Sequence, residues 1–530
     1  MLSDIAQCEE LFHTATGAAF ADIIIAGHRE TWPIRSKRLR AFLRRSYYQA
    51  TGEAASAAEI RSALDLLEAR AQFDGPERAV HVRIAEHAGH IYLDLADEQW
   101  RAVDIGPDGW RVIGCPPVRF RRPPGMLPLP EPQQGGSIES LNSFLNLASR
   151  DDFVLIAAWL LAALRSGGPY PLLAISGEQG SAKTVLSKLL KALIDPNAAP
   201  VRSLSREERE LMIATKNGYL LAFDNLSGLP VWLSDALCRL ASGGSFAVRQ
   251  LYSDDEEVLF EAARPILLNG IEDVISRPDL GDRAIFLTLA PIGEAQRRPE
   301  SELWRDFDIA RPRMLGALLD AVVHGLRTVG RVHLDRLPRM ADFALWASAC
   351  ETALWPAGAF ARAYAANRST AIEGMIEADP VAACVRGLMA GRSAWMGSAA
   401  DLLRGADFAG DEIWKRSPGW PKTPRALAGR LRRAQTFLRT LGIEVTFSRE
   451  GQAGTRMITV STVTEHIVGT VSSVRHQGSR SRAKQPQPAD DVRDDKYPPD
   501  LVGLCSIGQA SVTAADDADG ADGNAPFCVR

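Results

Sequence analysis

The stretch Gly177-Glu178-Gln179-Gly180-Ser181-Ala182-Lys183-Thr184 decides the expected fold, because a glycine-bearing loop that ends in Lys-Thr is typical of nucleotide phosphate sites. A short apolar strand precedes it at 171–175, and an amphipathic helix follows it at 185–193. A phosphate-binding loop requires this strand–loop–helix context. The N–H groups of the loop and of the helix N-terminus would face the phosphates. We therefore predict that these eight residues bind a nucleoside triphosphate, ATP.

Two side chains of this loop have expected roles, and one position departs from the usual pattern. Lys183 would reach the β- and γ-phosphate oxygens, and the Thr184 hydroxyl would ligate Mg²⁺. Ala182 stands where a glycine usually precedes the lysine. Its methyl group narrows the backbone choices but removes no N–H donor. A chance match in a Gly/Ser stretch is the alternative, and the flanking strand and helix argue against it.

Length and composition indicate a protein of several domains without a membrane segment. The chain has 530 residues and 46% hydrophobic residues, which favours three or four soluble domains. The longest apolar run, 153–164, has acidic and basic flanks and reads as a buried helix. The N-terminus has no secretion signal, so we expect a cytoplasmic protein. The net charge of −4 owes much to nine aspartates between Asp490 and Asp522, which leaves the remainder near neutral or slightly basic.

The cysteine and histidine positions do not favour a structural metal site. Seven cysteines are scattered without a CxxC pair, so neither a disulfide framework nor a zinc ribbon is expected. His87 and His90 are close in sequence, but the Ala-Gly between them is typical of a hairpin tip. We interpret this segment as a turn.

The pattern along the chain predicts an α/β protein with an AAA+-like P-loop NTPase core and smaller domains on either side. Helix and strand signals mix near the N-terminus, helices alternate with apolar strands around the loop, and helical composition follows. A Pro- and Gly-rich segment reads as a connector, with a PxxP-type ligand as the alternative. The predicted parts are an N-terminal α+β domain (1–120), a linker (121–136), the ATPase core (137–302), a helical lid (303–380), a winged helix (381–460) and a disordered acidic tail (461–530).

Asp224 is the second candidate for the nucleotide site. It ends the apolar stretch 218–224 and lies forty-one residues after Lys183. A carboxylate at the end of a neighbouring strand would support the magnesium ion, whereas an aspartate at an ordinary turn is the alternative. The next residue is Asn225, where many ATPases place the glutamate that activates water. Another carboxylate would then have to act as base, and the candidates are Glu178, Glu256 and Glu257.

Two further residues complete the predicted catalytic set. Asn269 ends the apolar strand 264–269, where its amide could orient the attacking water near the γ-phosphate; a plain turn residue is the alternative. Arg283 precedes another apolar strand and could stabilise the transition state of ATP bound by a neighbouring subunit. A surface ion pair with Asp282 is the alternative for Arg283.

The order of these elements resembles the superfamily-three helicase type of ATPase found in phage and plasmid primase–helicase proteins, and in particular ATP-binding proteins of prophages and integrated elements. The resemblance covers about 137–295 in its motifs. It implies a DNA-contacting hairpin, here 243–252, with Arg249 and Tyr252 as candidates for contacting DNA; a packed hairpin without DNA is the alternative. It also implies a homo-oligomer of hexameric-ring type with an arginine finger in trans. The first 130 residues lack zinc-ribbon cysteines and an acidic polymerase triad, so primer synthesis is not predicted.

The expected winged helix has its own argument for DNA. After Thr423-Pro424, leucines recur on one face of the predicted helix, and Arg425, Arg432 and Arg439 recur every seven residues on roughly the opposite face. Two strands, 443–447 and 456–460, flank a predicted wing at 451–454. DNA phosphates are one receiver for the three arginines, and solvent is the alternative.

These expectations combine into one functional hypothesis with an alternative. We expect a Mg²⁺-dependent ATPase of helicase or translocase type that acts on single-stranded or forked DNA in mobile-element replication, with other replication proteins as partners. The alternative is an ATP-controlled DNA-binding switch with slow hydrolysis, which Asn225 favours. A small-molecule kinase is disfavoured because the chain has large extra domains and a basic winged helix.

Overall fold

The structure is a computed structural model that describes residues 8–204, 207–249, 257–271, 274–275, 277–405, 417, 419–450 and 455–462. The chain divides into two units, Met1–Glu465 and His466–Arg530, and all described residues belong to the first. The predicted wing at 451–454 and nearly all of the predicted tail therefore lie outside the described residues.

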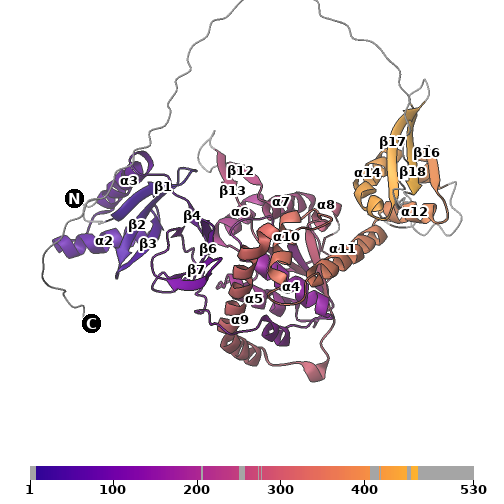
Figure 1. The fold of residues 1–530 in the computed structure, drawn as a ribbon. Coiled ribbons are helices and arrows are strands. Elements are labelled where there is room, and N and C mark those ends of the chain that lie inside the picture. The colour runs from indigo at the N-terminus through magenta and orange to yellow at the C-terminus, as the bar shows by residue number, and fades with distance from the viewer. Residues whose placement is uncertain are drawn as a thin grey trace, which may run out of the picture. The chain divides into compact units, whose positions relative to one another are not determined.

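The first N-terminal layer is a three-stranded antiparallel meander covered by two helices (Figure 1). Its buried residues come from β2, β3 and one face of each helix. Ser56 and Glu59 form a capping box that fixes the start of the second helix. The mixed helix and strand signals near the N-terminus did not locate the three strands. The elements are β1 (Cys8–His13), β2 (Ala19–Ile25), β3 (His28–Pro33), α2 (Lys37–Thr51) and α3 (Ala57–Phe73).

A second antiparallel sheet follows, a β-meander with strands in the order β5-β6-β7-β8. Ala88 and Gly89 have φ of +50° and +78°, so the segment between His87 and His90 is the tight hairpin turn that the sequence predicted. The short strands β4 and β9, which come before and after this sheet in the sequence, pair in parallel. The elements are β4 (Val80–His81), β5 (Ile84–His87), β6 (His90–Asp94), β7 (Ala102–Gly106), β8 (Gly109–Ile113) and β9 (Arg119–Phe120).

The core of the molecule is a parallel four-stranded sheet in the order β11-β14-β10-β15. The strands are β10 (Leu172–Gly177), β11 (Leu221–Leu226), β14 (Ile266–Gly270) and β15 (Ala284–Leu289). Alternate residues of β10 pack into different hydrophobic clusters: Leu173 and Ile175 into one, Leu172 and Ala174 into the other. Both faces of the sheet are therefore buried, as parallel sheets require.

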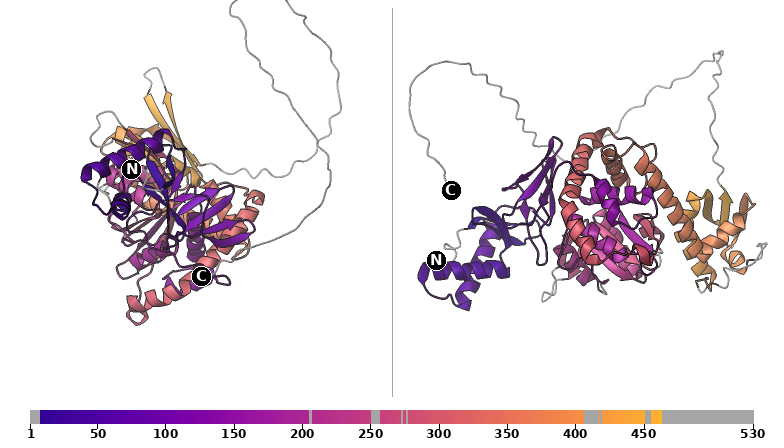
Figure 2. Two further views of the ribbon diagram at one scale, coloured as in Figure 1. Left: turned by 90° about the vertical axis from the view of Figure 1, so that its left-hand side faces the viewer. Right: turned by 90° about the horizontal axis from the view of Figure 1, so that it is seen from below.

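Helices cover the two faces of this sheet (Figures 1 and 2). The larger cluster takes residues from α4, α5, α9, α10 and α11, and the smaller from α6, α7 and α8. Residues 303–380 are mostly helical, as predicted. The elements are η1 (Ile138–Phe144), α4 (Arg150–Ala163), α5 (Lys183–Ile194), α6 (Glu208–Asn217), α7 (Val231–Ser242), α8 (Pro278–Gly281), η2 (Glu294–Gln296), α9 (Glu300–Thr328), η3 (Val329–Arg331), α10 (Ala341–Glu351) and α11 (Ala359–Ala378).

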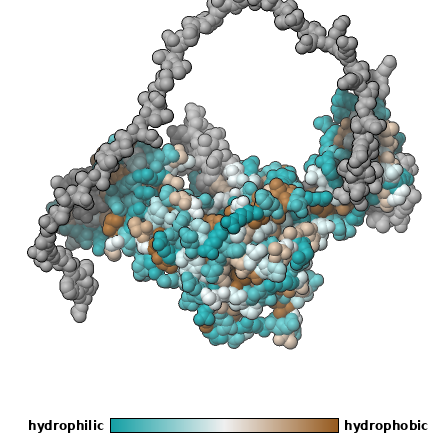
Figure 3. All heavy atoms as spheres, viewed as in Figure 1, coloured by the Kyte–Doolittle hydropathy of each residue, from teal (hydrophilic) through white to brown (hydrophobic). Residues whose placement is uncertain are grey.

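The apolar run at 153–164 forms most of α4 and is buried in the larger cluster, which confirms the prediction of a core helix. None of the described helices has the length and apolar character needed to cross a bilayer. On the face shown in Figure 3, hydrophilic residues predominate at the surface of the central part, and hydrophobic residues form small separate patches.

A two-stranded antiparallel hairpin lies between α7 and β14 in the sequence. Its strands are β12 (Ser245–Arg249) and β13 (Glu257–Glu261). Its first strand lies within 243–252, where the resemblance implied a hairpin, whereas its second strand lies beyond that range. The backbone of Arg249 ends β12, whereas Tyr252 lies outside the described residues.

The C-terminal elements form a small antiparallel sheet, order β16-β18-β17, packed on three helices. Thr423 Oγ1 accepts a hydrogen bond from the Ala426 N–H at 3.2 Å, so the predicted cap and helix start are confirmed. The elements are α12 (Pro380–Met389), β16 (Ala394–Ser398), α13 (Ala399–Arg404), α14 (Pro424–Thr440), β17 (Ile443–Glu450) and β18 (Thr455–Thr462).

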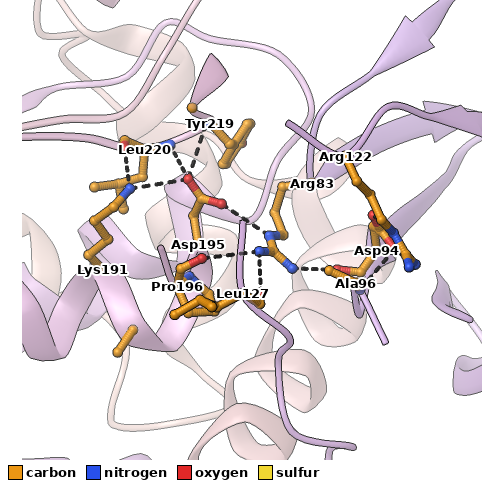
Figure 4. A network of polar contacts seen from close by, with 12 residues as sticks. Arg83, Asp94, Ala96, Arg122, Leu127, Lys191, Asp195, Pro196, Tyr219 and Leu220 are labelled. Carbon is orange, nitrogen blue, oxygen red and sulfur yellow. Dashed lines mark hydrogen bonds and ion pairs between the residues drawn. The ribbon is translucent and has the colours of Figure 1, made fainter. Parts of the chain in front are cut away.

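A buried ion cluster joins the second N-terminal sheet to the core (Figure 4). Arg83 is fully buried, and its guanidinium donates to Asp195 Oδ1 at 3.1 Å and to the carbonyl oxygens of Asp94 and Leu127. The other carboxylate oxygen of Asp195 accepts from Lys191 Nζ at 3.2 Å. It also accepts from the N–H groups of Tyr219 and Leu220, just before β11. Because Lys191 lies on α5, this cluster braces the two elements that carry the candidate site.

Candidate nucleotide site

The carboxyl ends of three neighbouring parallel strands bring the predicted site residues to one edge of the core sheet. Gly177 ends β10, Asp224 lies in β11, and Asn269 lies in β14 between them. This edge is where open α/β sheets hold their ligands. Gly177 has φ of +149°, and a Cβ on it would lie 2.5 Å from the Leu289 carbonyl oxygen, so only glycine fits this close approach to β15.

The loop from Gly177 to Thr184 enters α5 through a left-handed turn. Gly180 has φ of +85°, and Ala182, the residue before the first residue of α5, has φ of +64°. Ala182 caps the helix without a side-chain hydrogen bond. The first N–H groups of α5 thus have no side-chain acceptor at the cap and can serve an anion. Glu178, Gln179 and Gly180 are exposed at the tip of the loop, whereas Ser181 is buried.

Lys183 is held inside its own loop. Its Nζ donates to the carbonyl oxygens of Gly177 and Glu178, each at 2.7 Å, and to Ser181 Oγ at 3.2 Å. Burial lowers the pKa of Lys183, and the nearby charge of Asp224 opposes that shift. The ammonium is therefore positioned by backbone carbonyls rather than by a carboxylate, which leaves it available to a phosphate.

The two predicted magnesium residues are brought together. Thr184 Oγ1 donates to Asp224 Oδ1 at 2.9 Å. A hydroxyl and a carboxylate oxygen at this spacing fit the hard oxygen ligands that Mg²⁺ prefers, with phosphate and water for the remaining positions. Asn225 follows with φ of +58°, a conformation that asparagine tolerates, and its side chain is exposed.

Asn269 lies at the predicted strand end, but its amide is already engaged. It is 1% exposed; its Oδ1 accepts from the Asn225 N–H at 3.0 Å, and its Nδ2 donates to Ser187 Oγ at 2.8 Å. Ser187 Oγ in turn donates to the Lys183 carbonyl at 2.9 Å. Asn269 therefore links β14, β11 and α5. The sequence predicted only a contact with water for this residue and not this bracing role.

Arg283 lies at the opposite edge of the sheet from the loop of its own chain. It directly precedes Ala284, which pairs with Leu172 at the start of β10, whereas Gly177 ends that strand. Five residues of strand separate the two ends by about 16 Å. Arg283 Nη1 donates to the carboxylate and the carbonyl of Asp279, both at 2.7 Å. The expected alternative pair with Asp282 is wrong.

Asp282 has other partners. Asp279 pairs with Arg283 instead, because the two residues lie four positions apart and the turn of α8 brings their side chains together. The guanidinium of Arg368 lies 2.7 Å from one carboxylate oxygen of Asp282, and Arg339 lies 3.5 Å from the other.

Sequence reasoning missed a strap over the loop. Asn146, between η1 and α4, donates to the carbonyl oxygens of Ser181 at 3.2 Å and Ala290 at 2.6 Å. The Ile292 N–H donates to the Gly180 carbonyl at 3.2 Å. Arg297 Nη2 lies 3.6 Å from the place of a Cβ on Gly180. No local pattern marks these residues, since they meet the loop only through the fold.

A cavity of about 260 Å³ lies beside the first turn of α5. Its lining is mixed. The apolar residues are Phe144, Leu145, Ala182, Val185, Leu186, Ile292 and Leu303, and the polar or charged ones are Ser143, Asn146, Gln296, Arg298 and Glu300. A cavity that offers apolar side chains together with a few polar groups, next to a candidate phosphate loop, suits a planar base.

The other candidate residues are placed with less detail. Glu178 is exposed at the loop tip, Glu256 lies outside the described residues, and Glu257 starts β13. On α14, the side chains of Arg425, Arg432 and Arg439 are all exposed, as predicted.

Comparison with protein families now identifies the chain. A sequence model described as "Actinomycete integrative conjugative element replication protein" matches residues 138–369, and a model of the "AICE RepA C-terminal domain" matches residues 381–478. The two matches follow one another and together span more than half of the 530 residues. The chain belongs to this replication-protein family. The integrated-element part of the predicted resemblance is thereby confirmed.

Structural similarity to solved proteins is low. A structure of the NrS-1 C-terminal region shares 10% identity with this replication protein at a TM-score of 0.37, covering 85% of this chain and 96% of that one. A JCV helicase structure shares 15% identity at a TM-score of 0.22, covering 39% of this chain and 56% of that one. At such scores these similarities carry no argument about this chain. No curated protein matches the sequence.

Proposed function

We propose that this replication protein is a Mg²⁺-dependent ATPase of helicase or translocase type that acts on DNA. The observation that carries the proposal is the meeting of Lys183, Thr184 and Asp224 at one sheet edge beneath an uncapped helix N-terminus. This set supplies a cation, two oxygen ligands and backbone donors, which are the groups that a magnesium–triphosphate needs. The core would then be a P-loop domain, and the C-terminal elements a winged helix.

The residues of the site would divide three tasks in this reaction: binding the phosphates, holding the metal and positioning the loop. The loop N–H groups and Lys183 bind the phosphate oxygens and hold them in place. Thr184 and Asp224 hold the metal, which when bound neutralises charge on the transferred phosphoryl group. Asn269 fixes the position of Asn225 and α5 relative to β14. The cavity beside α5 takes the adenine, and Asn146 keeps the loop closed around the phosphates.

The proposed assembly is a homo-oligomeric ring in which Arg283 serves a neighbour's nucleotide. Its place at the sheet edge away from its own loop supports action in trans rather than in cis. The hairpin of β12 and β13 is the proposed DNA contact, with Arg249 and Tyr252 as its candidate residues. Single-stranded or forked DNA is the proposed substrate.

A second candidate function has its own observation. Asn225 cannot abstract a proton, and Glu178 is the one carboxylate of the described loop that could replace a base. An ATP-controlled switch, in which the nucleotide sets the oligomeric state and turnover is slow, uses the same binding residues without needing a base.

Phosphate release with magnesium-ATP, measured with and without single-stranded DNA, tests the proposal. Lys183→Ala should lower release to background because it removes the phosphate cation. Lys188→Ala, on the same helix but paired with Glu300 at 3.2 Å, is the matched control and should retain activity. Strong stimulation by DNA supports the motor. Slow release that ignores DNA, with nucleotide binding still lost in Lys183→Ala, supports the switch, and binding unchanged in that variant contradicts both.

A further inference from the structure

The C-terminal elements form a groove lined by four arginines, which we name the arginine groove: Arg425 and Arg432 from α14, Arg449 from β17 and Arg456 from β18. The groove has a volume of about 700 Å³. Arg425 and Arg432 lie seven residues apart on one face of the helix, with the small Ala428 between them. Room for a ligand therefore exists between the helix and the two strands.

The two strand arginines lie directly opposite each other. Arg449 pairs with Arg456 in the antiparallel ladder of β17 and β18, and Phe447 pairs with Ile458 two residues away on the same face. Like charges at directly opposed positions repel and destabilise a sheet. A bound polyanion would neutralise both arginines and so remove this repulsion.

Three of the four arginines have no acidic side chain beside them in the pockets that they line, whereas Arg432 also lines a second pocket that contains Asp279 and Asp282. No acidic residue lines the groove, and within the described ranges none of its four guanidiniums forms an ion pair or hydrogen bond. Elsewhere on α14 the pattern differs. Arg430 pairs with Asp379 at 2.9 Å, and Arg439 lies 3.8 Å from Glu444. The positive charge of the groove is therefore only partly offset by acidic side chains.

The aromatic ring in the groove has no free face for a base. Arg432 covers Phe447 at 4.4 Å from the ring centre, and Phe447 packs against the hydrophobic core of this region. Proteins that bind single strands stack bases on open aromatic faces. The charged groups of the groove are all guanidiniums, which suit phosphate oxygens, and its other polar residues are Ser398 and Ser448.

We propose that the arginine groove binds the phosphate backbone of double-stranded DNA, independently of nucleotide. The choice of DNA over RNA rests on the proposed function; the choice of a duplex rests on the covered ring of Phe447. The groove also revises the predicted interface, since Arg449 and Arg456 join Arg425 and Arg432, whereas Arg439 does not line it. It adds a duplex contact to a protein for which the sequence predicted single-stranded or forked DNA.

Fluorescence anisotropy with the full-length protein and a labelled duplex of about two helical turns tests this proposal, without ATP or magnesium and across a salt series. We expect the double variants Arg449→Ala/Arg456→Ala and Arg425→Ala/Arg432→Ala each to weaken binding by about tenfold or more. Each should also reduce the slope of log affinity against log salt by up to about two. Arg404→Ala, an exposed arginine paired with Asp401, is the matched control and should change affinity less than twofold.

Several outcomes would overturn the proposal. These are unchanged binding in both double variants, an equal loss in Arg439→Ala, or tighter binding of a single strand or an RNA duplex than of the DNA duplex. Thermal unfolding checks that the variants fold, and loss of the Arg449–Arg456 repulsion should leave the midpoint unchanged or raise it. Because this assay contains no nucleotide, its result is separate from that of the hydrolysis test.

Discussion

Ala182 carries backbone strain in the candidate phosphate loop. Its φ of +64° is a left-handed conformation that costs an L-residue with a Cβ about 1–2 kcal/mol. Asn225, on the neighbouring side of the site, has φ of +58° at a lower cost, because asparagine adopts this region more readily. Two such residues within one site are expected where the backbone must present N–H groups to a ligand.

Ala182→Gly should stabilise the protein by about 1 kcal/mol, since glycine adopts the left-handed conformation without a steric penalty. The free energy of unfolding, measured with urea, gives this value. Ala192→Gly is the matched control, because Ala192 lies within α5, where glycine costs about 1 kcal/mol. A loss of stability in Ala182→Gly would show that the turn is not strained.

At the scale of elements, β14 is the strand that holds the site together. It lies between β10 and β11, and its Asn269 joins the start of α5 to the end of β11 through a single amide. A buried side chain with both ends bonded fixes the relative position of its neighbours. Movement of Asp224 against Thr184 is thereby restricted.

Asn269→Ala should therefore destabilise the protein by about 2–3 kcal/mol, because it leaves the Asn225 N–H without its acceptor and removes the donor to Ser187 Oγ, which keeps its bond to the Lys183 carbonyl. Urea unfolding measures this loss, and Asn142→Ala, an exposed residue of η1, should change stability by less than about 0.5 kcal/mol. Unchanged stability together with a loss of turnover alone would favour the role in orienting water over the bracing role.

The elements near the loop could be predicted because their signals are local. The apolar strands, the helix after Lys183 and the cap at Thr423 each depend on residues within a few positions, and the structure has them where the sequence indicated. The first three strands lacked a strong alternating pattern and were missed. Asn146 and the pairing of Arg283 with Asp279 depend on how the chain folds, which spacing does not show. The contact of Arg432 with the ring of Phe447 likewise depends on the fold and not on local spacing.

At the scale of the whole molecule, the buried cluster of Arg83, Asp195 and Lys191 connects the N-terminal region to the elements of the site. Burial alone would raise the pKa of Asp195, but the charges of Lys191 and Arg83 outweigh it and lower that pKa to about 2. The carboxylate therefore stays ionised and stabilising above about pH 4. That contribution is lost as the pH falls from about 4 toward 2.

Asp195→Asn should lower the free energy of unfolding by about 3 kcal/mol at neutral pH, since it leaves two buried cations without their counter-charge. It should also remove part of the acid sensitivity between about pH 4 and 2. Urea unfolding followed by tryptophan fluorescence at several pH values measures both. Asp335→Asn, at an exposed position, is the control and should have little effect. Equal stability of the two variants would contradict a bracing role for the cluster.

The place of Arg283 makes a prediction about assembly that no single chain can satisfy. Because about 16 Å of strand separates it from its own loop, the proposed role of Arg283 requires a nucleotide bound by a neighbouring subunit. Lys183→Ala and Arg283→Ala should each abolish hydrolysis alone. When the two variants are mixed equally in a ring, about a quarter of the interfaces regain an intact loop facing an intact arginine. Phosphate release should therefore recover toward about a quarter of the wild-type rate. Mixing each variant with itself at the same concentration is the control, and a mixture as inactive as its parts would exclude Arg283 from a neighbour's site.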